Sequence, residues 1–291
     1  MLSVPLPLTV NATEDQLKNH QAMLLHWFSV DSKQAINLTL NRLKEDILGQ
    51  RAEIRFTSDD GENVNGLIGF SNSANSSNKL ALAIHPMGLD QQFWWNEKSP
   101  LPAVRLTDRL REQGYTVISL DSRHHGERSR NGFSAKELIK RAHSNEPRLY
   151  IEAVVGTVRD YRTLLNWAKK EYMPDKVLIM GYSMGAQISL LLASYESNID
   201  TIVSMVPPYV ESPTSPVAPR IHNSRITDAN VLWLAGKQDQ HSTQSQTQNT
   251  FDQIGSTNKL LKWFDAGHRL PEQALDEVLN FFDSINSGAK K

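Results

Sequence analysis

The chain of 291 residues has an ordinary globular composition, with 39% hydrophobic residues, 22% charged residues and a net charge of −1. The near-zero charge provides no electrostatic basis for binding nucleic acid or an anionic membrane, and no apolar run approaches the ~20 residues that span a bilayer. The absence of cysteine excludes disulfides, thiolate catalysis and cysteine metal sites. Because residues 1–10 lack the basic segment of a signal peptide, we expect a cytoplasmic protein.

The first fifty residues are predicted to be helical. Thr13 is a typical N-cap residue, and apolar side chains then recur at roughly helical spacing: Leu17, Leu24 and Phe28. A second helix is predicted over 32–48 because apolar residues recur at i, i+4, i+7 and i+11: Ile36, Leu40, Leu43 and Ile47. Gly49 is placed to end it. We therefore expect residues 1–50 to form a helical N-terminal extension that packs on the main domain, with an oligomer contact or an active-site cap as alternatives.

An antiparallel hairpin is predicted to open the main domain, which we assign to residues 51–291. Residues 51–57 alternate between polar and apolar side chains, which is typical of a half-buried strand. The sequence Ser-Asp-Asp-Gly at 58–61 is typical of a turn, and residues 64–70 provide the returning strand.

The remainder of the chain alternates between short apolar strands and amphipathic helices. The predicted strands are 80–84, 115–120, 177–180, 201–206, 231–235 and 260–264. The predicted helices are 103–113, 150–170, 184–193, 242–254 and 272–285. Continuously apolar strands separated by helices indicate an α/β fold with a mostly parallel sheet of about eight strands and helices on both faces.

The strongest chemical signal is Gly-Tyr-Ser-Met-Gly at 181–185, which matches the G-x-S-x-G pattern of a nucleophile elbow. A buried strand precedes the pattern and a helix follows it, as such an elbow requires. Gly181 and Gly185 supply the small neighbours that a strained serine needs, and the helix N-terminus behind Ser183 favours developing negative charge. These features predict that Ser183 is a nucleophile.

From residue 51 to residue 285 the pattern resembles the α/β-hydrolase fold. That family arranges its catalytic residues in the chain order serine, acid, histidine. The matching positions here are Asp239, which follows the strand 231–235, and His268, which follows the strand 260–264. The resemblance implies that His268 is the general base for Ser183 and that Asp239 orients the imidazole.

Three other residues compete for the acid and base roles. Asp228 precedes its strand and so lies at the wrong end of the sheet, and Asp265 is close enough to His268 in sequence that we expect it to shape the turn. His241 lies two residues beyond Asp239 and is the weaker candidate for the base.

The oxyanion hole is expected to use two backbone N–H groups. One is that of Met184, the residue after the nucleophile. The other is that of Met87, because His-Pro-Met-Gly at 85–88 resembles the family's His-Gly-x-Gly segment, with Pro86 where glycine is usual. We expect His85 to be a structural hydrogen-bonding residue.

A second loop, residues 121–129, resembles the Asp-x-x-x-His-Gly-x-Ser loop of α/β-hydrolases, and especially its His-Gly-Glu-Arg version in dienelactone-hydrolase-like and acyl-esterase-like members. The resemblance implies that this loop supports the oxyanion loop. It also contributes to a group of four residues with metal-binding side chains: His124, His125, Glu127 and His143. Their spacing matches no zinc pattern, so we expect no metal and no cofactor.

Aromatic residues follow the oxyanion loop and are expected either to line a substrate pocket or to pack in the core: Phe93, Trp94 and Trp95. Residues 122–149 and 207–228 are predicted cap or lid segments.

Together the motifs predict a serine hydrolase that cleaves a small carboxylic ester, a thioester or a sugar acetate through an acyl-serine intermediate. The alternatives are a prolyl-oligopeptidase-like peptidase and a non-catalytic binding protein of the same fold. The sole partner expected is the small-molecule substrate.

Overall fold

The computed structural model describes residues 14–31, 36–72, 78–99, 101–130, 134–142, 144, 147–211 and 215–286. Within these ranges nine strands form one sheet: β1 (Thr39–Asp46), β2 (Gly49–Thr57), β3 (Asn63–Gly69), β4 (Lys79–Ile84), β5 (Tyr115–Leu120), β6 (Lys176–Tyr182), β7 (Thr201–Met205), β8 (Asn230–Gly236) and β9 (Lys259–Phe264). The helices are α1 (Glu14–Phe28), α2 (Val104–Glu112), α3 (Ala135–Ala142), α4 (Arg148–Glu171), α5 (Met184–Tyr195), α6 (Gln244–Asp252) and α7 (Gln273–Asn286). Five short 3-10 turns join some of them in the described residues.

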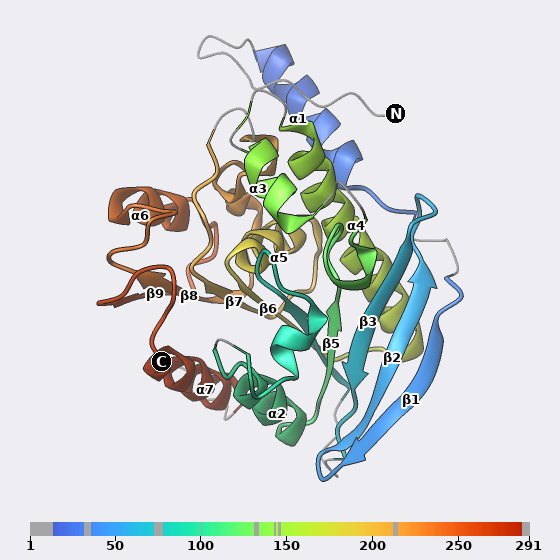
Figure 1. Cartoon of the computed structure of the whole chain (residues 1–291). Coiled ribbons are helices and arrows are strands. Elements are labelled where there is room, and N and C mark those ends of the chain that lie inside the picture. The colour runs from blue at the N-terminus through green and yellow to red at the C-terminus, as the bar shows by residue number, and fades with distance from the viewer. Residues whose placement is uncertain are drawn as a thin grey trace.

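The strand order is β1-β2-β3-β5-β4-β6-β7-β8-β9. From β5 to β9 the pairing is parallel, whereas β1, β2 and β3 pair antiparallel and lengthen the sheet at one edge (Figure 1). The chain leaves β4 for β5 on one side and then crosses to β6 on the other. Open α/β sheets place their sites at the carboxyl ends of the strands beside such a reversal. The predicted parallel sheet and the opening hairpin are confirmed.

The second N-terminal helix, predicted over 32–48, is wrong where the structure describes it. Residues 39–46 form β1, which pairs with β2 in a register that shifts between Arg42 and Lys44. The apolar residues that suggested a helix do not form a buried stripe, since Leu40 is 45% exposed and Ile47 is 96% exposed. Gly49, with φ of +133°, closes a hairpin turn instead of ending a helix. Pairing with the free edge of β2 satisfies the backbone here and overrides the local pattern.

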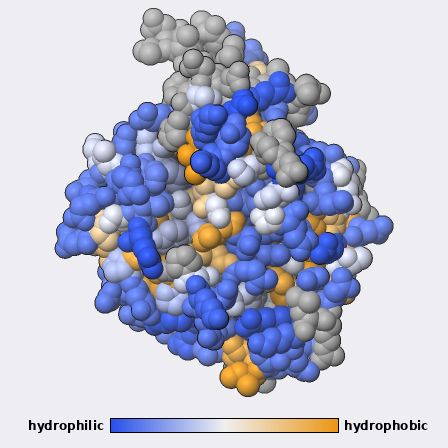
Figure 2. Space-filling model, in the orientation of Figure 1, coloured by the Kyte–Doolittle hydropathy of each residue, from blue (hydrophilic) through white to orange (hydrophobic). Residues whose placement is uncertain are grey.

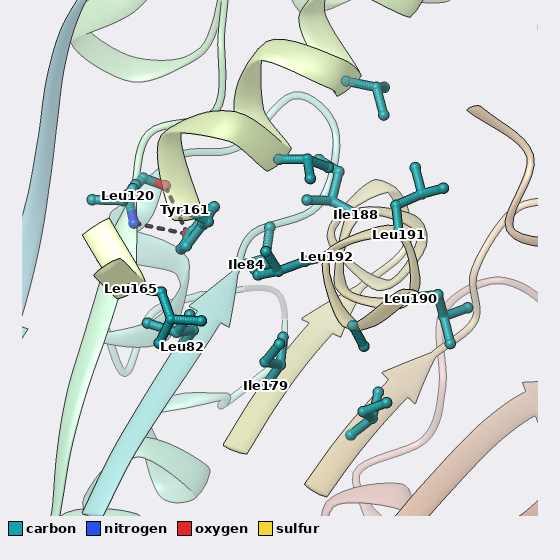
Figure 3. Packing of buried hydrophobic residues seen from close by; sticks show 14 of the residues in the cluster. Leu82, Ile84, Leu120, Tyr161, Leu165, Ile179, Ile188, Leu190, Leu191 and Leu192 are labelled. Carbon is teal, nitrogen blue, oxygen red and sulfur yellow. Dashed lines mark hydrogen bonds between the residues drawn. The ribbon is translucent and has the colours of Figure 1, made fainter. Parts of the chain in front are cut away.

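Helices cover both faces of the sheet. α2 and α7 pack on one face, and α4, α5 and α6 pack on the other, where α1 and α3 add a further layer (Figure 1). Figure 3 shows the core on the face covered by α4 and α5, where side chains of β4 and β6 meet those of the two helices. Burial of each such aliphatic side chain stabilises the fold by about 1.5–3 kcal/mol. The Tyr161 hydroxyl accepts from the Leu120 N–H (2.9 Å) and donates to the Ala83 carbonyl (3.1 Å), which ties α4 to the sheet.

The C-terminal end of α1 is anchored by an aromatic cluster. The ring of Phe28 stacks on Tyr195 with centroids 4.4 Å apart and meets the edge of His222 at 5.6 Å. The imidazole of His222 is buried, and its Nε2 donates to the Pro216 carbonyl while its Nδ1 accepts from the Tyr195 hydroxyl. The anchor therefore joins α1, α5 and the segment after β7.

The buried His222 makes stability depend on pH. Burial lowers the pKa of His222 to about 4, and the Arg225 cation adds to the shift, although the hydrogen bond to Pro216 opposes it. The imidazole of His222 therefore binds a proton less readily in the folded state than in the unfolded chain, where its pKa is about 6.5. We expect the full stability above pH 6.5 and a progressive loss between pH 6.5 and 4, at up to about 1.4 kcal/mol per pH unit for this group.

Urea unfolding followed by tryptophan fluorescence between pH 7 and 4.5 measures this dependence. His222→Gln removes the titrating group and should flatten the curve. The buried His85, whose pKa burial lowers to about 3, leaves a residual slope in the variant. Identical pH curves for the variant and the wild type would contradict the assignment.

The surface in Figure 2 is largely hydrophilic, with hydrophobic residues gathered in small patches. Among the described residues, each helix is either too short or too polar to cross a membrane.

Candidate active site

Ser183 lies at the sharp turn between β6 and α5. Its φ of 56° and ψ of −118° fall in a backbone region that residues other than glycine rarely adopt. The turn is possible because its neighbours are glycines: a Cβ on Gly181 would collide with the Gly185 backbone, and a Cβ on Gly185 would collide with the Ile84 carbonyl. Ser183 consequently lies at the carboxyl end of a central strand and at the N-terminus of a helix.

The structure brings the three predicted residues Ser183, Asp239 and His268 together. His268 Nε2 lies 2.7 Å from Ser183 Oγ, and His268 Nδ1 lies 2.9 Å and 3.0 Å from the two carboxylate oxygens of Asp239. An ionised carboxylate only accepts hydrogen bonds, so Nδ1 carries the proton and Nε2 is free to accept the proton of the serine hydroxyl. This arrangement matches that of a nucleophile, a base and an orienting acid.

Three further hydrogen bonds fix the loops that carry Asp239 and His268. The Tyr182 hydroxyl donates to the His268 carbonyl (2.9 Å) and accepts from the Leu270 N–H (3.0 Å). The N–H of His241 donates to Asp239 Oδ1 (2.8 Å). Because the Asp239 side chain is only 4% exposed, little water competes for its carboxylate.

The competing residues lie elsewhere or make other contacts. The exposed Asp265 pairs with Lys237 (2.8 Å), and Asp228 accepts from the adjacent Thr227 hydroxyl before β8 begins. The ring of His241 packs edge-on against that of His268, with centroids 4.5 Å apart, and faces the neighbouring cavity.

Both residues predicted to supply the oxyanion donors line the same cavity as Ser183. Met184 is the first residue of α5, so its N–H has no acceptor within the helix. Met87 lies in the loop after β4. Met87, Ser183 and Met184 line the same cavity, whose volume is about 510 Å³. The cavity therefore brings the nucleophile and both predicted donor residues to one site.

Of the remaining residues that line this cavity, only His241 was considered individually from the sequence, as the weaker candidate for the base. The remaining residues are Ile139, Ala142, Tyr150, Pro208, Tyr209, Val210, Glu211, Gln240, His241, Ser242, Thr243 and Gln246. Several of them fall in the two predicted lid segments, which was the sole sequence signal for them. The apolar members lie on α3, on α4 and after β7, and the polar members mostly follow Asp239.

The aromatic residues after the oxyanion loop are not part of this lining, so their predicted role in the pocket is corrected. Phe93, Trp94 and Trp95 are at most 6% exposed and belong to the core that β4 and β5 form with α2. Trp95 Nε1 donates to the Ser119 hydroxyl (2.7 Å), and the Phe93 ring packs against Trp94. Phe93 and Trp94 lie in the short 3-10 turn at Gln91–Trp94 and Trp95 follows it, and the large apolar area of the three rings is buried in this core.

The loop after β5 supports the loop after β4. The Asp121 carboxylate accepts from the N–H groups of Gln91 and Glu127 (2.9 Å each) and from Asn65 Nδ2 (2.7 Å), which ties the two loops to β3. Burial raises the pKa of Asp121, although these hydrogen bonds oppose the shift. In the part of the chain that the structure describes, no three histidine, aspartate or glutamate side chains are grouped to hold a metal. His143 lies outside the described residues.

Comparison with known proteins gives the family. The model of the dienelactone hydrolase family matches residues 96–276, which include Ser183, Asp239 and His268. The chain belongs to the dienelactone hydrolase family. It is accordingly a hydrolase of the α/β-hydrolase fold, and this family member carries serine at the elbow and no cysteine.

Solved structures share the fold of this dienelactone hydrolase family member. Acetyl xylan esterase 1 from Thermoanaerobacterium sp. JW/SL YS485 has a TM-score of 0.71 at 16% identity, covering 94% of each chain. Acetyl xylan esterase from Paenibacillus sp. R4 has a TM-score of 0.69 at 14% identity, covering 96% of this chain and 97% of its own. A cold-adapted esterase from an Arctic intertidal metagenomic library has a TM-score of 0.68 at 16% identity, covering 86% and 99%. A sequence search of curated proteins found no match.

Proposed function

We propose that the protein is a serine esterase in which Ser183 attacks the carbonyl carbon of a small carboxylic ester. The observation that carries the proposal is the continuous hydrogen-bonded chain from Ser183 Oγ through the imidazole of His268 to the carboxylate of Asp239. A serine hydroxyl is a weak nucleophile near neutral pH, and a neutral imidazole within hydrogen-bonding distance can remove its proton as the bond to carbon forms.

The steps then follow from the geometry. His268 Nε2 takes the proton of Ser183 and returns it to the leaving alcohol, which leaves an acyl-serine. Asp239 holds the tautomer and stabilises the imidazolium. The N–H groups of Met87 and Met184 donate hydrogen bonds to the carbonyl oxygen and stabilise the negative charge that develops on it. Water, activated by the same imidazole, releases the acid.

The cavity supports a short acyl group and a polar alcohol. Its volume of about 510 Å³ lies within the range of small-molecule sites. Among the lining residues, Ile139, Tyr150 and Val210 offer apolar surface that suits an acyl chain. The lining residues Glu211 and Gln246 offer acceptors and donors for hydroxyl groups. Sugar acetates are therefore good candidates, as the names of the similar acetyl xylan esterases also suggest.

We further propose that the protein acts in the cytoplasm, which a sequence without cysteine supports.

Covalent labelling tests the proposed nucleophile directly. A fluorophosphonate should label the wild-type protein at Ser183, as identified by mass spectrometry of the labelled peptide, and a non-catalytic binding protein should remain unlabelled. Comparing p-nitrophenyl acetate with an aminoacyl amide then separates an esterase from a peptidase of the same fold. Failure of both labelling and ester hydrolysis would overturn the proposal.

Tyr150 is expected to limit the acyl length. It lines the cavity, and its hydroxyl donates to Gln187 Oε1 (2.6 Å), which fixes the ring. Tyr150→Ala should open this wall and raise the ratio of kcat/KM for p-nitrophenyl hexanoate over acetate by about 10-fold or more, since each added methylene contributes roughly 1–3 kcal/mol in an apolar pocket. Tyr150→Phe keeps the ring and is the control. An unchanged ratio in Tyr150→Ala would place the acyl group elsewhere.

A further inference from the structure

The carbonyl of Pro86 is held by two donors. His85 Nδ1 lies 2.8 Å from it, and the Leu89 N–H donates to it at 3.3 Å across a tight turn. Gly88, at the third position of that turn, has φ of +82°, as a type II turn requires. The orientation of this one peptide unit is therefore fixed both by the turn and by a side chain.

The tautomer of His85 follows from its other contact. The backbone N–H of Ser122 donates to His85 Nε2 at 2.9 Å, so Nε2 is unprotonated and the ring proton resides on Nδ1, where it is donated to Pro86. His85 is fully buried, and burial lowers its pKa to about 3. The ring consequently remains neutral, with this one tautomer, throughout the pH range in which an esterase works.

A trans peptide unit is planar, and its C=O and N–H point in opposite directions. Anchoring the Pro86 carbonyl toward the buried ring therefore turns the Met87 N–H away from the core, toward the cavity that Met87 shares with Ser183. We propose that His85 is a positioning residue that aims the Met87 N–H at the oxyanion by holding the Pro86 carbonyl. The inference rests on the proposed function, because it assigns the oxyanion donor of that reaction.

A second histidine, His125, contacts the side chain of Met87. His125 Nδ1 contacts the Arg123 carbonyl at 2.9 Å, its Nε2 lies 3.3 Å from Met87 Sδ, and its ring centroid lies 5.1 Å from that of His85. The side chain of Met87 is thus held by the loop after β5, while its N–H is oriented by His85.

Two substitutions separate the two hydrogen bonds of His85. In His85→Asn the amide nitrogen takes the position of Nδ1 and can still donate to Pro86, but the contact with Ser122 is lost. In His85→Gln the amide oxygen reaches the position of Nε2 and can still accept from Ser122, but the contact with Pro86 is lost. Each variant loses one buried hydrogen bond, so we expect similar falls in the midpoint of thermal unfolding.

The measurement is steady-state hydrolysis of p-nitrophenyl acetate together with inhibition by a boronic acid, whose tetrahedral serine adduct occupies the oxyanion hole. His85→Gln should lower kcat by about 10²-fold with little change in KM and should weaken boronate inhibition in parallel. His85→Asn should retain most of kcat. A purely structural role predicts equal losses in the two variants, and that result would overturn the inference.

Gly88→Ala provides an independent test if neither histidine variant folds. A Cβ at this exposed position meets no atom within 4 Å, but it strains the turn that holds the Pro86 carbonyl. We expect the same selective fall in kcat, and an unchanged kcat would contradict the inference. Because all of these comparisons start from a wild-type enzyme whose activity depends on Ser183, failure of the inference is distinct from failure of the proposed function.

Discussion

Ser183→Ala is expected to lower kcat for p-nitrophenyl acetate by on the order of 10⁴- to 10⁶-fold, because it removes the atom that forms the acyl-enzyme. The residual rate would come from the oxyanion hole and from substrate binding. The folded structure should be retained, since the hydroxyl of Ser183 contacts only His268 among the hydrogen bonds described for it. The measurement is initial rates over a range of substrate concentrations, with circular dichroism to check folding.

Ser204→Ala is the matched control for this change. Ser204 lies on β7, fully buried, and its Oγ has no hydrogen-bond partner among the described residues. Removing an unsatisfied hydroxyl should leave the activity unchanged and the stability equal or slightly higher. If Ser183→Ala retained more than about a tenth of the wild-type kcat, the nucleophile would have to be another residue.

Asp239→Asn is expected to lower kcat by about 10⁴-fold. The His241 N–H keeps donating to the side-chain oxygen, so the new amide nitrogen turns toward His268 Nδ1. That nitrogen donates a hydrogen bond, which favours the tautomer of His268 with its proton on Nε2. In this tautomer the imidazole cannot accept the proton of Ser183, although every heavy atom stays in place.

The tautomer change can be observed without activity. Nitrogen NMR of histidine-labelled protein should show the proton of His268 on Nδ1 in the wild type and on Nε2 in Asp239→Asn. Asp265→Asn, which alters an exposed carboxylate near His268 in sequence, should change kcat by less than about threefold, since its ion pair with Lys237 is exposed. A larger effect at Asp265 than at Asp239 would reverse the assignment of the acid.

Some features were predictable from the sequence because they depend on local chemistry. The elbow at Ser183 requires small residues around a strained turn, and Gly181 and Gly185 in the sequence meet that requirement. The loop positions of Asp239 and His268 follow from the apolar strands before them, since parallel strands bring their carboxyl ends to one edge. The parallel sheet, its flanking helices and the opening hairpin likewise follow from the alternation of short apolar runs with amphipathic ones.

Other features were decided only by the tertiary structure. Residues 36–47 have apolar spacing that fits a helix, yet residues 39–46 form β1 and pair with β2, because a free sheet edge satisfies their backbone groups. Phe93, Trp94 and Trp95 are equally suited to a pocket and a core, and only the direction of the turn at Gln91 places them in the core. The cavity wall at Tyr150 and the tautomer of His85 arise from contacts between segments far apart in sequence, which a one-dimensional pattern does not encode.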